Sequence, residues 1–115
     1  MTGDRHYQAL GFSSRAETLR AMASGDERRI IAAALGAAEE SPDPDWIEAA
    51  AVALTLSNLH GVQRSGLLAL STLIRRFGAS VDLSSVITVL DRLQGIPGLE
   101  GVVADVRDDI DVFGE

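Results

Sequence analysis

The sequence predicts an all-α fold, organised as a short right-handed α-solenoid of about three helical hairpins. Hydrophobic residues make up 46% of the 115 residues but aromatic residues only 4%. The core must therefore come from many small aliphatic contacts, of the kind that packed helices make. Helix start signals recur along the chain, and no segment alternates apolar and polar residues between hairpin turns. A β-sandwich or a β-barrel is therefore not expected.

Two capping boxes mark the expected first hairpin. In a capping box, a serine side chain accepts a hydrogen bond from a backbone amide of the first turn, and a glutamate three residues later reaches back to the serine. The sequences SRAE at 14–17 and SGDE at 24–27 both fit this pattern. Helices are expected to begin after Ser14 and after Ser24, and the residues from Arg5 to Leu10 allow a further short helical turn.

The expected second hairpin has its own start and stop signals. Asp43 can cap a helix whose first position is Pro44, where a proline fits because the first amide has no partner within the helix. The sequence NLHG at 58–61 is expected to form a turn. The spacing of apolar residues after this turn predicts a helix that ends at Gly78, because glycine suits the residue that follows a helix.

The third hairpin is expected between Asp82 and the end of the sequence. Asp82 is a candidate N-cap for a helix over 83–93, and the sequence GIPG at 95–98 breaks the chain after it. Apolar residues at helical spacing then predict a last helix over 102–113.

Three glycines, Gly36, Gly66 and Gly101, lie inside expected helices. A glycine costs a helix about 1 kcal/mol relative to alanine. We expect a close crossing of a neighbouring helix at these positions to offset this cost.

A weak internal repeat relates the expected hairpins. It divides the single domain, 1–115, into an N-terminal segment, 1–12, and hairpins at about 13–41, 43–78 and 82–114. One such hairpin buries too little apolar surface to fold alone, so we expect the three to stack. The aligned residues are Ala32, Leu35 and Ala38 with Leu67, Leu70 and Leu73 at an offset of 35, Leu67, Leu70, Ile74 and Phe77 with Val103, Val106, Ile110 and Phe113 at an offset of 36, and Ala16, Leu19 and Met22 with Ala50, Ala53 and Leu56 at an offset of 34.

Two segments resemble the second helix of a HEAT-like repeat, which has an acidic turn residue, then an arginine, then small and apolar residues. They are DERRIIAAAL at 26–35 and GVQRSGLLAL at 61–70. The resemblance covers residues 13–114 and departs from the pattern at Gly61, which replaces the acidic residue, and at Glu100, which replaces the arginine. HEAT-like families act mostly as protein-binding scaffolds whose second helices line a concave surface, so the resemblance implies protein binding.

No catalytic, cofactor or metal site is recognisable in the sequence. The chain has no cysteine, which excludes thiol nucleophiles and thiolate metal sites. It contains no nucleophile elbow, dinucleotide-binding glycine motif or Walker sequence. His6 and His60 are far apart in the chain, and His60 is expected to cap or pack rather than to act as a base. The sequence DID at 109–111 resembles the start of an EF-hand loop, but too few residues follow it to complete the loop.

Charge is the most informative property of the chain. Its 17 acidic and 10 basic residues give a net charge of −7, which argues against binding to nucleic-acid phosphates and favours a cationic partner. The acids gather within 38–63 and 77–115, where they either keep the ends of a solenoid soluble or steer a basic protein into place. Trp46 either packs at the edge of the core or contributes to such an interface. The candidate partner-binding residues are Asp105, Asp108, Asp109, Asp111, Asp45, Glu48 and Trp46.

The size, acidity and lack of catalytic groups are similar to those of small acidic immunity proteins, some of which have HEAT-like repeats. Such proteins neutralise a bacterial toxin, often a basic nuclease. We therefore expect a non-catalytic module that binds a cognate toxin domain, without cofactor, nucleic acid or membrane. Residues 1–12 hold no secretory signal or membrane span, so a cytoplasmic location is expected. The alternative is an intracellular adaptor that binds an acidic peptide on the concave face through Arg64, Arg75 and Arg76.

Overall fold

The structure is a computed structural model that describes residues 15–114, and this part of the chain is helical without any strand. The predicted all-α fold is therefore confirmed. The expected helical turn near Arg5 to Leu10, the segment 1–12 and the capping serine Ser14 lie outside the described residues. The helices are α1 (Arg15–Ala23), α2 (Glu27–Glu40), α3 (Pro44–Thr55), α4 (His60–Phe77), the 3₁₀ turn η2 (Gly78–Ser80), α5 (Leu83–Leu93) and α6 (Glu100–Phe113).

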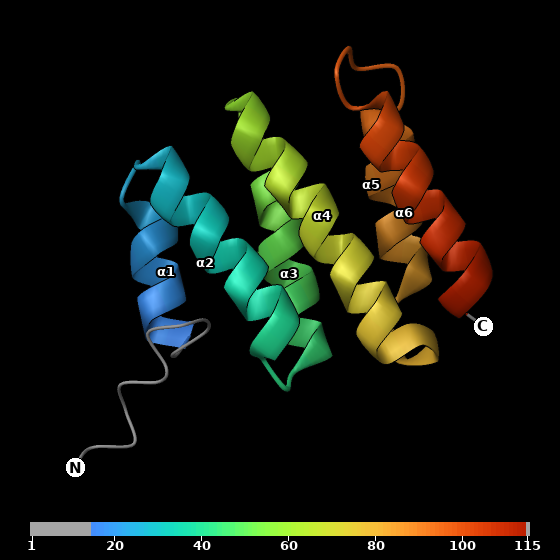
Figure 1. Ribbon diagram of the computed structural model, residues 1–115, viewed down its shortest axis with the longest axis horizontal. Coiled ribbons are helices and arrows are strands. Elements are labelled where there is room, and N and C mark those ends of the chain that lie inside the picture. The colour runs from blue at the N-terminus through green and yellow to red at the C-terminus, as the bar shows by residue number, and fades with distance from the viewer. Residues whose placement is uncertain (1–14, 115) are drawn as a thin grey trace.

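The helices form antiparallel pairs arranged in two layers. Helices α2, α4 and α6 lie in the layer nearer the viewer, and α1, α3 and α5 lie behind them (Figure 1). Helix α4 contacts α2, α3 and α6. It is therefore the central element of the described fold.

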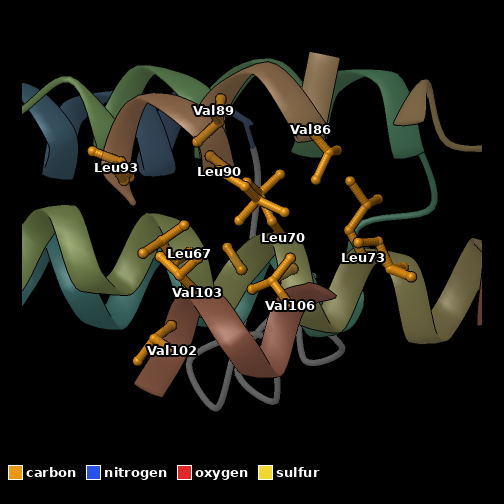
Figure 2. Packing of buried hydrophobic residues seen from close by; sticks show 14 of the residues in the cluster. Leu67, Leu70, Leu73, Val86, Val89, Leu90, Leu93, Val102, Val103 and Val106 are labelled. Atoms are coloured by element: carbon orange, nitrogen blue, oxygen red, sulfur yellow. The ribbon is translucent and has the colours of Figure 1, made fainter. Parts of the chain in front are cut away.

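Small aliphatic residues build the core, as the composition predicts. Leu70 of α4 and Leu90 of α5 have no exposed surface, and neither has Val106 of α6. Their side chains converge between the two layers (Figure 2). Burial of a leucine or valine side chain stabilises a fold by about 1.5–3 kcal/mol. The contacts among α4, α5 and α6 therefore hold the C-terminal pair against the centre of the molecule.

Three predicted helix boundaries agree with the structure. The Asp43 carboxylate accepts hydrogen bonds from the amides of Asp45 (3.1 Å) and Trp46 (3.2 Å) at the start of α3. The Asp82 carboxylate accepts one from the amide of Ser84 (3.2 Å) at the start of α5. Helix α4 ends at Gly78, whose φ of 50° belongs to the left-handed region that favours glycine.

The predicted cap of α2 is wrong by two residues. Its N-cap is Asp26, whose carboxylate accepts a hydrogen bond from the amide of Arg29 (3.3 Å). Ser24 belongs to the preceding turn, where its hydroxyl donates to the carbonyl of Ala21 (2.6 Å). Gly25 separates the two positions with a φ of 77°, so the chain turns there and α2 begins only after this residue.

The predicted turn at 58–61 also ends earlier in the structure, because His60 and Gly61 are the first residues of α4. No side chain from the α4 N-cap, Leu59, caps this end. Instead the carboxylate of Glu27 lies so close to Gly61 that a Cβ there would collide with it. A carboxylate near a helix N-terminus is stabilising. Glycine at 61, where HEAT-like repeats have an acidic residue, thus makes room for an acid from α2.

The alignment of α2 with α4 at an offset of 35 matches the buried faces only in part. Ala38 and Leu73 are both fully buried. Ala32 is exposed although its partner Leu67 is fully buried. The buried faces agree at an offset of 32, because Ile30, Ala34 and Ala37 are buried like Val62, Gly66 and Ala69. Alanine occupies so many positions of α2 that apolar spacing alone could not fix its orientation. Leu67 and Val103, aligned at an offset of 36, are both buried as predicted.

In the alignment of the first helices, Leu19, Ala53 and Leu56 lie on the outer face instead of in the core, whereas Met22 is partly buried against the smaller apolar cluster. Leu19 is 53% exposed and Leu56 is 66% exposed. The buried face of α1 is formed by Thr18 and Ala21, and that of α3 includes Ala51 and Leu54. The residues aligned at an offset of 34 are therefore not the ones that form the buried faces of α1 and α3.

Candidate functional site

The outer face of α6 carries an acidic strip formed by Asp105, Asp108 and Asp111. All three side chains are exposed, and their spacing of three residues places them along one side of the helix. The opposite side of α6, which includes Val106, is buried against α4 and α5. None of the three forms an ion pair with a residue that the structure describes. Their negative charge therefore faces solvent.

The nearest basic residue on α6 does not neutralise this strip. Arg107 points toward α5, where its Nη2 donates to Oδ1 of Asp91 at 3.0 Å and to Oε1 of Gln94 at 2.7 Å. The guanidinium is therefore paired on the other side of the helix. It does not pair with the acidic strip.

Asp109 does not belong to the outer face. It is 7% exposed and lies between α6 and α4. The hydroxyl of Ser71 donates to its Oδ2, and Nε of Arg75 lies 3.2 Å from its Oδ1. The structure thus separates Asp109 from the other three aspartates of α6, because its carboxylate links two helices.

Asp45 and Glu48 belong to a second acidic group, in a shallow hollow of about 460 Å³ between α3 and α5. The hollow is lined by Asp45, Glu48, Ala49, Val52, Asp82 and Ser85. Sequence reasoning assigned Asp82 only a capping role and did not single out Ser85. The local sequence does not predict that Asp82 and Ser85 lie beside Glu48, because only the packing of α3 on α5 brings them together.

Glu48 is the buried member of this group, with 9% of its surface exposed. Burial raises the pKa of the Glu48 carboxyl, and the charges of Asp82 and Asp45 add to this increase. Hydrogen bonds from the Ser85 side chain and the Asp82 backbone oppose it. The carboxylate is therefore hydrogen-bonded but desolvated, and its closest charged neighbours are also negative.

Trp46 points to a different part of α3. It is partly buried and packs against the main apolar cluster. The Arg15 guanidinium carbon lies 5.4 Å from the centre of its ring, and Arg15 also forms an ion pair with Asp43. These contacts join α1 to α3, so the structure favours the packing interpretation of Trp46 that the sequence left open.

The arginines of α4 that could line a basic surface are mostly engaged within the molecule. Arg75 pairs with Asp109. Arg76 donates from Nη1 to the carbonyl of Ala38 (2.6 Å), and its guanidinium carbon lies 4.6 Å from the centre of the Phe77 ring. Of the three, only Arg64 makes no ion pair or hydrogen bond recorded among residues 15–114.

No protein-family model, curated protein or solved structure matches this chain. Its function is therefore inferred from its own residues. Within the described region, no group of three or more histidine, aspartate or glutamate side chains is arranged to hold a metal ion. None of the helices that the structure describes is both long enough and apolar enough to cross a membrane.

Proposed function

We propose that this protein is a non-catalytic binding module, an acidic immunity protein that binds and neutralises a cognate bacterial toxin domain in the cytoplasm. In this proposal, the three helix pairs stack as a short right-handed α-solenoid with HEAT-like repeats. The partner is a basic protein, held in a 1:1 complex.

The acidic strip of α6 carries the proposal. Asp105, Asp108 and Asp111 are exposed side by side without a cation from the described residues to neutralise them. Unpaired charges of one sign on a helix face attract a partner of opposite sign over long range and raise the rate of association. The net charge of −7 acts in the same direction.

The alternative, an adaptor that binds an acidic peptide through the α4 arginines, has weaker support. Arg75 and Arg76 already have partners within the molecule. An acidic peptide would share the Arg75 guanidinium, whose side chain is 58% exposed, with the buried Asp109 carboxylate. Arg64 alone provides too little charge to hold such a peptide.

Association kinetics test the proposal. We expect the gene immediately upstream to encode a large protein with a basic C-terminal domain, and this domain is the partner to use. Asp105→Asn combined with Asp108→Asn should lower its association rate constant about tenfold at low salt and weaken the salt dependence. Glu39→Gln combined with Glu40→Gln removes the same charge from exposed positions on α2 and is the matched control.

Three results would count against the proposal. One is an equal loss of rate in both double variants, and another is a wild-type rate that does not change with salt. The third is a failure of the wild-type chain to restore growth to cells that produce the toxin domain.

A further inference from the structure

The outer face of α3 presents an uncovered apolar ridge formed by Ala49, Val52, Ala53 and Leu56. Their spacing places them on one side of the helix. Ala49, Ala53 and Leu56 are exposed, and Leu56 keeps 66% of its surface. The side of α3 that carries Ala51 and Leu54 faces the interior, and Val52 is half-buried at the border where α3 lies beside α5. A continuous apolar ridge on a helix surface is a feature of docking surfaces.

The ridge begins at the acidic hollow between α3 and α5. Ala49 and Val52 belong to both, because they line the hollow together with Asp45, Glu48 and Asp82. None of the described residues that line the hollow is basic. An incoming chain would therefore meet aliphatic surface along α3 and three carboxylates at the end of that surface.

Glu48 makes the hollow more than a group of exposed acids. Glu48 as a whole residue is nine-tenths buried, and the hydrogen bonds to its partly desolvated carboxylate come from the Ser85 side chain and the Asp82 backbone, neither of which carries a positive charge. A buried carboxylate without a counter-charge is unfavourable. An arginine or lysine head group placed in the hollow would supply that charge through strong, charge-assisted hydrogen bonds.

We propose that the ridge and the hollow form one docking surface for a segment of the partner that carries aliphatic side chains followed by an arginine or a lysine. The aliphatic side chains lie along Val52, Ala53 and Leu56, and the cation enters the hollow beside Glu48. Arginine and lysine suit this place because their aliphatic stems can lie on Ala49 and Val52 while the charged ends reach the carboxylates. The proposal rests on the proposed function only for the identity of the partner.

The length of the surface limits the length of the segment. Glu48 and Leu56 are eight positions apart in α3 and its C-cap, which corresponds to about 12 Å along a helix axis. Two turns of a helix, or about four residues of extended chain, span this distance. A short peptide can therefore represent the segment.

The experiment uses the full chain and two synthetic peptides. One is acetyl-leucyl-alanyl-leucyl-arginine amide, and the other has citrulline, an uncharged isostere, in place of arginine. In ¹H–¹⁵N NMR titrations, the arginine peptide should shift the amide signals of residues 45–56 and 82–85, and these shifts should reach a plateau as the peptide concentration rises. The citrulline peptide should bind about tenfold more weakly, the effect of losing a hydrogen bond between charged groups.

Two variants separate the parts of the surface. Glu48→Gln should abolish the preference for the arginine peptide over the citrulline peptide. Leu56→Ser should lower the affinity for both peptides by the same factor. Asp108→Asn on α6 is the matched control and should leave both affinities unchanged. Circular dichroism should show the wild-type helix content in every variant.

Four outcomes overturn this inference. Equal affinity for the two peptides removes the role of the cation, and shifts confined to α6 place the binding elsewhere. Concentration-dependent shifts of residues 45–56 without peptide assign the surface to a second copy of the chain. If the peptides fail while the α6 double variant still slows toxin binding, this docking surface is wrong but the proposed function stands. If the peptides bind while the α6 double variant has no effect on toxin binding, the docking surface stands but the proposed function is wrong.

Discussion

The Arg75 guanidinium lies 3.2 Å from the Asp109 carboxylate and joins α4 to α6, beside the hydrogen bond that the Ser71 hydroxyl donates to the same carboxylate. The two ends of this pair differ in environment, because the Arg75 side chain is 58% exposed and the Asp109 side chain 10% exposed. Asp109→Ala should therefore cost about 1–3 kcal/mol, since it leaves the buried Ser71 hydroxyl without its acceptor. Arg75→Ala should cost less, because water screens the exposed half of the pair.

Urea denaturation monitored by circular dichroism measures both losses. Asp108→Ala, on the exposed side of α6, is the matched control and should change the free energy of unfolding by no more than about 0.5 kcal/mol. Equal losses at 108 and 109 would show that the contact with Ser71 contributes nothing to stability.

Two helical glycines should respond in opposite directions to the same substitution. A Cβ at Gly66 would lie 2.8 Å from the carbonyl oxygen of Ala51 and 2.8 Å from Cγ2 of Thr55, whereas a Cβ at Gly101 would meet nothing within 4 Å. Gly66→Ala should therefore destabilise the protein by about 1–3 kcal/mol through overpacking. Gly101→Ala should stabilise it by up to about 1 kcal/mol, the helix-propensity gain.

Thermal unfolding of the two alanine variants gives the test, with a lower midpoint expected for Gly66→Ala and a higher one for Gly101→Ala. The close crossing expected from the sequence holds at Gly66 and is wrong at Gly101. If both variants were less stable than the wild type, the result would contradict the finding that the space around Gly101 is open.

The sequence predicts this fold well where a helix boundary depends on neighbouring residues. Asp43, Asp82 and Gly78 act within one turn of their own helix ends, so their roles can be predicted from the order of residues alone. The prediction fails where a boundary or a register depends on another helix. Glu27 of α2 lies beside Gly61 in the first turn of α4, a contact that local sequence does not show, and the many alanines of α2 do not fix its orientation.

The candidate site likewise has one part that neighbouring residues predict and one part that depends on contacts between helices. Asp105, Asp108 and Asp111 lie on the face that helical spacing predicts for them. Asp109 is drawn inward by Ser71 and Arg75, which lie 38 and 34 residues away along the chain. The hollow around Glu48 likewise needs Asp82 and Ser85 from another helix. Contacts over such separations leave no local signal in the residues that make them.

The cap of α5 should show a characteristic dependence on pH. The Ser84 side chain, followed by the backbone amides of Ser85 and Ser84, holds the pKa of Asp82 below its ordinary value of 3.8. Folding therefore favours the ionised form, and the resulting stability is present above pH 3.8 and is lost as the pH falls through the lowered pKa. Asp82→Asn keeps an acceptor for the cap but does not titrate.

Thermal unfolding at a series of acidic pH values compares the two proteins. The wild type should be the more stable above pH 3.8, and the difference should shrink as the solution becomes more acidic. A difference that stays constant through this range would mean that ionisation of Asp82 does not contribute to the cap.

Glu48 should have the opposite dependence on pH. Burial raises the pKa of its carboxyl above the ordinary value of 4.5, so folding favours the protonated form. The contribution to stability is therefore fully present below pH 4.5 and is lost as the pH rises through the raised pKa. Glu48→Gln keeps a side chain of similar size without this loss, so the variant should gain stability relative to the wild type over the same interval. Urea unfolding at several pH values gives the difference in free energy. A difference that did not grow between acidic and neutral pH would show that the ionised Glu48 carboxylate is well solvated, and the hollow would then hold no uncompensated charge for a cation to neutralise.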